Sequence, residues 1–335
     1  NKLKEWFGDA LRDWDVTRDA PYFGFPIPGQ PDKYFYVWLD APVGYLASFQ
    51  TICEREGLDF DAWLSPDSTT EMHHFIGKDI IYFHCLFWPA MLEGAGFRLP
   101  TKVHAHGFLT VNGAKMSKSR GTFIKARTWL DHINPDALRY YFAAKLTPSL
   151  GDIDLSLDDF KARVNSDLVG KLVNIASRCS GFVHKLGGGC LSSALPDPEL
   201  YAHFVQQQEA IKADYDQVNF AGAMRQLMAL ADEANQYIDH HKPWQMAKEE
   251  GRADEVVAIC TQGLNLFRVL ITWLQPVIPE TAAQASLFLN CPVDRFDSVS
   301  EPLLNHSIEP FKPLMQRIEQ TQLDQVMDAS RESLA

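Results

Sequence analysis

Residues 106–121 read HGFLTVNGAKMSKSRG. Lys115 and Lys118 stand three residues apart in this stretch, serines alternate with them, and Gly113 and Gly121 lie on either side. Lysine ammonium groups on flexible stems, together with hydroxyl donors, can follow the charge of a triphosphate while its pyrophosphate departs. Short basic runs are usually solvated loops, but a run of aliphatic residues precedes these lysines. The stretch therefore predicts a phosphate-binding loop.

Three short runs upstream of this loop predict strands, at residues 34–39, 73–77 and 102–107. The first, YFYVWL, is apolar and aromatic throughout, which is typical of a strand buried on both faces of a parallel sheet. Helical patterns follow the first two runs, at residues 45–55 and 78–92. Alternating strands and helices predict a doubly wound α/β sheet. Three strands are few for such a sheet, which suggests that half of it is missing.

The pattern becomes helical beyond the loop. Residues 128–132 and 135–145 predict short helices, and residues 152–157 alternate as a connector. Residues 157–288 show helical periodicity almost throughout, interrupted at Gly and Pro positions, and predict a helical bundle. The Pro-containing tail from residue 290 predicts a wrapping segment before a final helix near residues 314–330.

Composition sets limits on the class of protein. The 335 residues suffice for about two or three domains, and 46% of them are hydrophobic. We find no apolar run of about 18 residues and no leader pattern, so neither a membrane partner nor a signal peptide is expected. The six scattered cysteines indicate reduced thiols in a cytoplasmic protein, without a disulfide framework or zinc ligands. The net charge of −12 excludes a general nucleic-acid coat but permits a local basic face.

The start of the chain predicts a longer protein. Asn1 is not an initiator, and residues 1–7 read as a helix entered midway. The chain is therefore expected to be the later part of a longer polypeptide.

Two motifs in the predicted sheet have the chemistry of a small-molecule site. Ligands of open α/β sheets bind at the carboxyl ends of the strands, where Trp38 and Tyr45 would form an aromatic floor suited to a thioether. A glycine at the second such end, Gly77, would let a ligand approach the backbone, and Asp79 could accept ribose hydroxyls. Alternatively, the aromatic residues are sheet core and Asp79 is an ordinary helix N-terminal carboxylate.

The helical half contains a possible interface for nucleic acid. Asn174 and Arg178 lie four residues apart and so share a helix face, within a helix made basic by Lys161, Arg163, Lys171 and Lys185. Trp244 follows Pro243 at a predicted helix start. An indole beside polar side chains can stack on an unpaired loop base and read its edge. The alternative for Trp244 is a core residue at the start of a helix.

The lysine loop resembles the second signature of class I aminoacyl-tRNA synthetases, and the residues around it resemble the methionyl enzymes. This resemblance implies that Lys118 is the principal catalytic phosphate ligand, with Lys115 in support. It assigns ATP to Gly77, Asp79, Leu109 and Lys118. It assigns the methionine side chain to Trp38, Ala41, Pro42, Tyr45, Ile80, Phe83 and His84. It assigns the CAU anticodon to Asn174, Arg178, Pro243 and Trp244.

The resemblance also implies a domain order and an activity. Residues 1–33 would end a connective insertion, 34–108 would form the second half of a Rossmann-like catalytic domain, 109–170 a stem-contact region, and 171–335 a helical anticodon-binding domain. The family activates methionine with ATP and Mg²⁺ to methionyl-adenylate and transfers it to tRNA(Met). The His-x-Gly-His signature, the carboxylate for the substrate amine and the metal-binding knuckle that can hold zinc are absent from these residues. The chain alone is therefore expected not to activate methionine.

Two alternative functions stay open. Another class I synthetase, such as the leucyl, isoleucyl, valyl or cysteinyl enzyme, would share the lysine loop but would not account for residues 38–42, WLDAP, followed by Tyr45. A stand-alone tRNA-binding module would account for the helical half only. Methionine-dependent ATP–pyrophosphate exchange distinguishes these possibilities.

Overall fold

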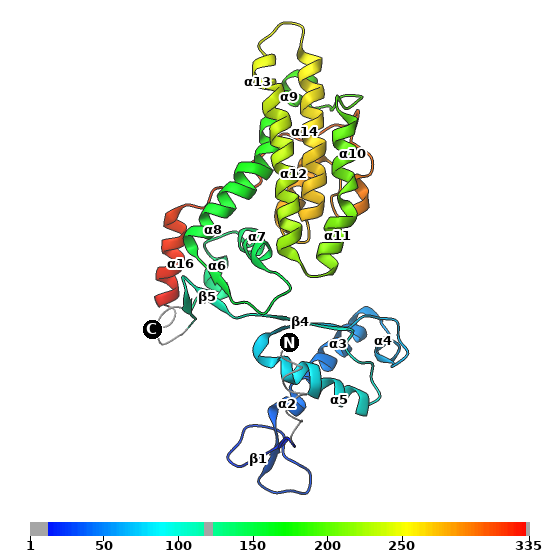
Figure 1. Ribbon diagram of the computed structural model, residues 1–335, viewed down its shortest axis with the longest axis vertical. Helices are drawn as coiled ribbons and strands as arrows, with labels where there is room; N and C mark the ends of the chain where they lie inside the picture. Colours follow the sequence, from blue (N-terminus) through cyan, green and yellow to red (C-terminus); the bar gives the residue numbers. More distant parts are fainter. Residues whose placement is uncertain (1–12, 117–122, 333–335) are drawn as a thin grey trace. The chain divides into compact units, whose positions relative to one another are not determined.

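The computed structural model describes residues 13–116 and 123–332 of the chain (Figure 1). These residues form two compact units, which divide after Gly107. Lys118 and the helical start predicted for residues 1–7 lie outside the described residues. The domain boundaries expected within each unit stay predictions.

The first unit combines small sheets with short helices. A parallel pair, β3 with β4, aligns Gly77 with His106 at its carboxyl end, and an antiparallel pair, β1 with β2, precedes it. The strands are β1 (Thr17–Asp19), β2 (Lys33–Phe35), β3 (His73–Gly77) and β4 (Lys102–His106). The helical segments are α2 (Val37–Asp40), α3 (Val43–Glu56), α4 (Phe60–Leu64), η1 (Lys78–Ile80), η2 (Phe83–Phe87) and α5 (Trp88–Gly94). The predicted strands at 73–77 and 102–107 are confirmed.

The strand predicted over residues 34–39 is wrong. β2 ends at Phe35, and Trp38 lies in the helix α2. A short run that is apolar throughout has no periodicity that separates a strand from a buried helix. Here Trp38 stacks on Phe83 of η2 and Tyr36 packs against Trp14, so neither ring lies in a strand.

The second unit begins with a three-stranded sheet in the order β6-β5-β7. Its strands are β5 (Leu109–Val111), β6 (Ala114–Lys115) and β7 (Ile153–Leu155). Asn112 and Gly113 have positive φ and turn β5 into β6, as a tight hairpin requires. β7 pairs parallel with β5, so the alternating residues predicted to be a connector form a strand instead. Alternation is the pattern of a half-buried strand.

Helices make up the rest of the second unit. Asn134 caps α7 by accepting a hydrogen bond from the Asp136 amide, and a proline occupies the first turn, so the predicted helix at 135–145 is confirmed. The helical segments are α6 (Ala126–Leu130), α7 (Pro135–Lys145), α8 (Leu157–Arg163), η3 (Val164–Val173), α9 (Asn174–Gly187), α10 (Pro198–Gln206), α11 (Gln208–Asp216), α12 (Phe220–His241), α13 (Pro243–Met246), α14 (Ala253–Leu274), α15 (Pro279–Leu289), η4 (Phe296–Val299) and α16 (Gln320–Glu332). Figure 1 shows α9, α10, α12 and α14 side by side as a bundle.

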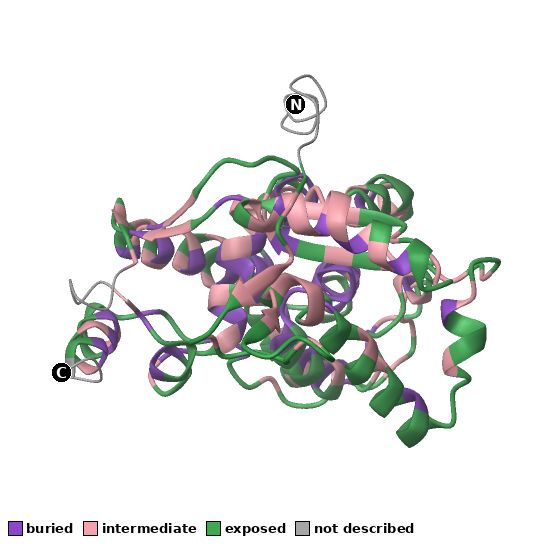
Figure 2. Cartoon of the chain, turned by 90° about the horizontal axis from the view of Figure 1, so that it is seen from below, coloured by how far each residue is buried: buried purple, intermediate pink, exposed green. Residues whose placement is uncertain are grey.

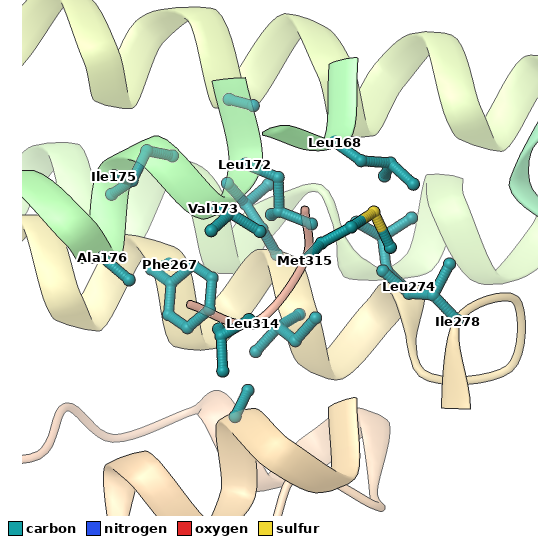
Figure 3. Close-up of a cluster of buried hydrophobic side chains, with 14 of the residues drawn as sticks. Leu168, Leu172, Val173, Ile175, Ala176, Phe267, Leu274, Ile278, Leu314 and Met315 are labelled. Atoms are coloured by element: carbon teal, nitrogen blue, oxygen red, sulfur yellow. The ribbon is translucent and has the colours of Figure 1, made fainter. Parts of the chain in front are cut away.

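The core of the bundle surrounds α14. This helix packs against α9, α10, α12 and α15. By length and composition alone α14 could span a membrane, but 94% of its most apolar window is buried inside the unit, as expected for a central bundle helix. Leu314 and Met315, from the segment before α16, close the cluster formed by η3, α9 and α14 (Figure 3). The tail therefore wraps the bundle, as its composition predicted.

Burial follows the amphipathic pattern of the sequence. In Figure 2 the helices carry buried residues on one side and exposed residues on the other. Exposed apolar side chains are frequent in the first unit, among them Tyr45 and Phe75, which are 46% and 61% exposed. The first unit therefore presents aromatic rings at its surface.

Candidate functional site

The carboxyl end of β3 brings Gly77 against Asp79. A Cβ built on Gly77 would lie 2.6 Å from Oδ1 of Asp79, closer than such atoms approach. Gly77 has an ordinary extended backbone, with φ −70° and ψ 152°. Because Gly77 has no side chain, there is room for the Asp79 carboxylate, which is itself exposed. An exposed carboxylate at a strand end can accept hydroxyl groups of a ribose.

Trp38 and Phe83 form a stacked pair beside this strand end. Their ring centroids are 4.2 Å apart and their planes differ by 8°. Trp14 packs against Phe83 at 5.2 Å and against Phe87 at 4.6 Å, so a second indole supports the pair. Sequence patterning did not single out Trp14, because it lies outside any periodic element. The stacking fills the space between Trp38 and Phe83, which leaves ring edges for a ligand to contact.

The imidazole of His84 holds the side chain of Tyr45. Nδ1 of His84 lies 3.0 Å from the carbonyl oxygen of Ile80, and Nε2 lies 3.0 Å from the Tyr45 hydroxyl. A carbonyl oxygen can only accept, so Nδ1 carries a proton; in the tautomer that is protonated on Nδ1 alone, Nε2 accepts from the Tyr45 hydroxyl. His84 is fully buried, whereas Tyr45 is 46% exposed. Tyr45 is therefore the member of the pair that a ligand can touch in this arrangement.

A second histidine, His74, completes this aromatic cluster. The Trp88 indole N–H donates to its Nε2 at 3.1 Å. Burial, and to a smaller extent the neighbouring His84, lowers the pKa of His74. A cavity of about 270 Å³ adjoins the cluster and is lined in part by Tyr45, His74 and Trp88. Of the predicted methionine-binding residues, all of which are described, only Tyr45 lines this cavity.

The remaining predicted residues of this site differ in exposure. Ala41 is exposed and Ile80 is half-buried. Pro42 is buried at the start of α3, so it shapes the turn between α2 and α3 rather than offering a contact surface. The structure thus brings the side chains of Trp38, Tyr45, Phe83 and His84 into one cluster.

The side chains of Asp154 and Thr110 hold the β5–β6 hairpin, which leads into the lysine loop. Oδ1 of Asp154 accepts hydrogen bonds from the Thr110 hydroxyl at 2.6 Å and the Gly113 amide at 2.8 Å. Leu109, assigned to ATP by the resemblance, is half-buried in β5 and packs against the core of the second unit. Lys115 is exposed, and its Nζ lies 6.0 Å from the ring centroid of Phe108. Lys118 lies outside the described residues.

The predicted anticodon residues lie on a polar seam between η3–α9 and α12. Nζ of Lys171 lies 2.8 Å from Oδ2 of Asp232, and Nδ2 of Asn174 donates to Oδ1 of Asn235 at 3.3 Å. Arg178 pairs with Asp239. Each pair joins residues 61 positions apart. The constant offset requires the two helical segments to run in the same direction.

Trp244 lies on the same side of the bundle as Arg178. The guanidinium carbon of Arg178 is 4.7 Å from the centroid of the Trp244 ring, which is a cation–π distance. Pro243 is buried as the first residue of α13, so it sets the helix start and does not offer a surface to a base. Asn174, Arg178 and Trp244, from two distant parts of the sequence, form one surface. Trp244 is half-buried and also packs against the core.

Two cations of the basic helix predicted from the sequence are paired with acidic side chains of a neighbouring helix. Lys171 and Arg178 pair with carboxylates of α12, and Nζ of Lys161 donates to Oε1 of Gln320 at 2.6 Å. The prediction counted charges on one helix, whereas the neighbouring helix supplies acidic partners. Asp232 and Asp239 have the same spacing along the sequence as Lys171 and Arg178. This matching spacing was the signal in the sequence from which the pairing could have been predicted.

Within the described parts of the chain, no group of three His, Cys, Asp or Glu side chains is arranged to hold a metal ion. All six cysteines fall in these parts and are free thiols.

Family models match both halves of the sequence. The model described as tRNA synthetases class I (M) matches residues 1–180. The model described as anticodon binding domain of methionyl tRNA ligase matches residues 191–326. The predicted fold class, a class I Rossmann-like region followed by a helical anticodon-binding domain, is confirmed.

Solved structures agree with these matches. The chain is similar to Mycobacterium tuberculosis methionyl-tRNA synthetase in complex with methionyl-adenylate, with a TM-score of 0.79 and 27% identity over 93% of this chain and 62% of that one. For a second structure of that protein bound by methionyl-adenylate, the TM-score is 0.79 and the identity 28%, again over 93% of this chain and 62% of that one. For the apo form of that protein, the TM-score is 0.76 and the identity 24%, over 95% of this chain and 63% of that one. This match shows similarity of fold alone. The chain spans less than two thirds of the length of these structures.

Proposed function

Because this chain belongs to the methionyl group of the class I tRNA synthetases, we propose that it serves as a methionine–tRNA ligase. The proposed reaction activates methionine with ATP to methionyl-adenylate and then transfers the methionyl group to tRNA(Met). The observation that carries the proposal is the cluster of Trp38, Tyr45 and Phe83 beside the Gly77–Asp79 strand end. It sets an apolar, sulfur-compatible surface next to a carboxylate suited to ribose.

In this proposal the aromatic cluster selects the amino acid. The thioether of methionine contacts the ring edges of Trp38 and Phe83, where sulfur–aromatic contacts are favourable. Tyr45, fixed by its hydrogen bond to His84, forms the exposed wall. His84 is buried and acts through Tyr45.

The lysine loop provides charge for the activation step. The methionine carboxylate oxygen forms a bond to the α-phosphorus of ATP, and the bond to the bridging oxygen breaks, so pyrophosphate leaves with its Mg²⁺. Lys118 and Lys115 stabilise the charge that accumulates on the leaving group. The attacking carboxylate is already ionised, so no general base is required. In the first unit, Asp79 is proposed to hold the ribose of ATP.

A complete ATP site needs further residues. The 335 residues contain no His-x-Gly-His tetrapeptide, and we propose that activation also depends on a segment that carries it. The chain by itself should therefore form no methionyl-adenylate. The helical bundle, with Asn174, Arg178 and Trp244 on one surface, is proposed to bind the CAU anticodon of tRNA(Met).

Methionine-dependent ATP–pyrophosphate exchange tests the activity. We expect none from the chain alone and robust exchange once the His-x-Gly-His segment is restored. In the restored protein, Lys118→Ala should lower the adenylation rate about 100- to 1000-fold with little change in methionine affinity. Exchange by the chain alone would refute the requirement for the second segment. Exchange supported by leucine or valine but not by methionine would refute the substrate.

A second candidate function is tRNA binding without catalysis, which the contact between Arg178 and Trp244 favours. Binding of a tRNA with a CAU anticodon, combined with no exchange even in the restored protein, would support this alternative.

A further inference from the structure

The side-chain amide of Asn235, on α12, contacts both polar residues that the proposed function assigns to the anticodon. Its Oδ1 accepts hydrogen bonds from Nδ2 of Asn174 at 3.3 Å and from Nη1 of Arg178 at 3.5 Å. Its Nδ2 donates to the backbone oxygens of Lys171 at 3.1 Å and Ala231 at 2.8 Å. We infer that Asn235 is a positioning residue that determines which atoms of Asn174 and Arg178 face a tRNA base. The inference rests on the proposed anticodon function.

Only one orientation of the Asn235 amide satisfies its neighbours. In the opposite orientation its NH₂ group would face the amide NH₂ of Asn174 and the guanidinium of Arg178, which are donors only. Its oxygen would then face two backbone carbonyls, which are acceptors only. The two carbonyls of Lys171 and Ala231 therefore fix the direction of the Asn235 oxygen, and that oxygen in turn fixes Asn174.

The consequence for Asn174 is a defined polarity. Because its Nδ2 points to Asn235, its Oδ1 is the atom left to face outward, and within the described residues Oδ1 has no hydrogen-bond donor. Arg178 is held by Asn235, by Asp239 and by the ring of Trp244. The surface thus offers one acceptor, from Asn174, beside the remaining donors of Arg178.

This polarity matches some bases and opposes others. Cytosine carries an exocyclic amino donor next to ring acceptors, so it can donate to Asn174 and accept from Arg178. Uracil has a carbonyl oxygen where cytosine has the amino group. That oxygen would face Oδ1 of Asn174, and two acceptors cannot form a hydrogen bond. If Asn235 were removed, the Asn174 amide could rotate and donate to uracil instead. Asn235 should therefore contribute to discrimination and not to affinity alone.

The experiment measures the Kd of the chain for two tRNA transcripts that differ at one base, with anticodons CAU and UAU. Asn235→Leu keeps the number and branching of the side-chain heavy atoms but removes both polar functions. We expect binding of the CAU transcript to weaken about ten-fold, the loss expected for one hydrogen bond, and the CAU-over-UAU preference to fall about ten-fold. Gln236→Leu, an exposed amide next on the same helix, is the matched control and should change neither value.

A second variant series separates positioning from structure. In an Asn174→Ala background, Asn235→Leu should change the CAU-over-UAU preference less than two-fold, because the residue through which Asn235 acts is gone. If Asn235→Leu does not fold, judged by circular dichroism, Asn235→Ser is measured instead, since its hydroxyl cannot bridge the same four groups. Equal weakening for both transcripts, with the preference intact, would overturn the inference.

Two further variants test the proposed anticodon binding independently of the positioning role of Asn235. If Arg178→Ala and Trp244→Ala bind both transcripts as the unaltered chain does, the surface does not bind an anticodon. If those two variants lose binding while Asn235→Leu keeps the full preference, only the positioning role is refuted.

Discussion

The guanidinium carbon of Arg178 lies 4.7 Å from the centre of the Trp244 ring, although the two residues belong to helices far apart in the sequence. A cation–π contact of this kind contributes about 0.5–1 kcal/mol at a partly exposed site. More importantly, Asp239 and Asn235 hold the same guanidinium from α12. The indole and the polar side chains are therefore presented to a ligand together, as recognition of an unpaired base requires.

Replacing Trp244 by alanine should weaken tRNA binding strongly. Base–aromatic stacking contributes about 1–3 kcal/mol, which corresponds to a rise in Kd of about 5- to 150-fold. The measurement is binding of a tRNA transcript with a CAU anticodon by fluorescence anisotropy. Trp63→Ala, which removes a 41% exposed indole from the first unit, serves as the control. Equal losses in the two variants would contradict a specific role for Trp244.

Phe83→Leu should lower methionine affinity while leaving the first unit folded. Leucine stays apolar but cannot stack on Trp38, whose ring lies 4.2 Å away. Loss of an aromatic pair costs about 0.5–1.5 kcal/mol, so we expect KM for methionine to rise several-fold in exchange assays of the restored protein. Phe60→Leu changes a ring that packs on Phe49 instead and should leave KM unaltered. An unchanged KM in Phe83→Leu would place the methionine side chain elsewhere.

Much of the fold follows from local signals in the sequence. The helix at 135–145 begins where Asn134 caps it and a proline starts it, and both signals are readable from the sequence. β3 and β4 were predicted from short runs that end at a Gly. The run at residues 34–39 failed because Trp38 packs on Phe83 of η2, a partner that lies about 45 residues later in the chain.

The candidate site was less accessible from the sequence. Asn174 and Arg178 could be placed on one face, because four residues make about one helical turn. Their partners Asn235 and Asp239 could not be identified from the sequence, because the register between two helices depends on how both pack against α14. The same limit applies to the tyrosine–histidine hydrogen bond of Tyr45 with His84, which spans 39 positions.

Gly77→Ala should weaken ATP binding without unfolding the first unit. The new Cβ would lie 2.6 Å from Oδ1 of Asp79, and the carboxylate, as the end of a flexible side chain, would move away from the strand end. Loss of one hydrogen bond to a charged group costs about 1.5–3 kcal/mol, so KM for ATP in the exchange assay should rise at least ten-fold. Gly94→Ala adds a Cβ that meets nothing within 4 Å and should not change KM. A normal KM in Gly77→Ala would show that Asp79 does not bind the nucleotide.

His74 should make the stability of the first unit depend on pH. Burial lowers its pKa below the ordinary value of 6.5, so the unfolded chain takes up a proton at a higher pH than the folded chain does. As pH falls below about 6.5 the unfolded state therefore gains protons first, and the free energy of unfolding decreases until pH reaches the folded pKa. Protonation also removes the acceptor at Nε2 for the Trp88 indole N–H, which lies 3.1 Å away.

In His74→Gln the side chain can still accept from Trp88 but cannot titrate. Thermal unfolding from about pH 7.5 down to about pH 5 should show a smaller loss of Tm in the variant than in the unaltered chain, because the proton uptake by the unfolded state at this position is gone. The comparison isolates His74 from the other histidines, which are common to both proteins. Parallel Tm curves over this pH range would show that His74 does not titrate differently in the folded and unfolded chain.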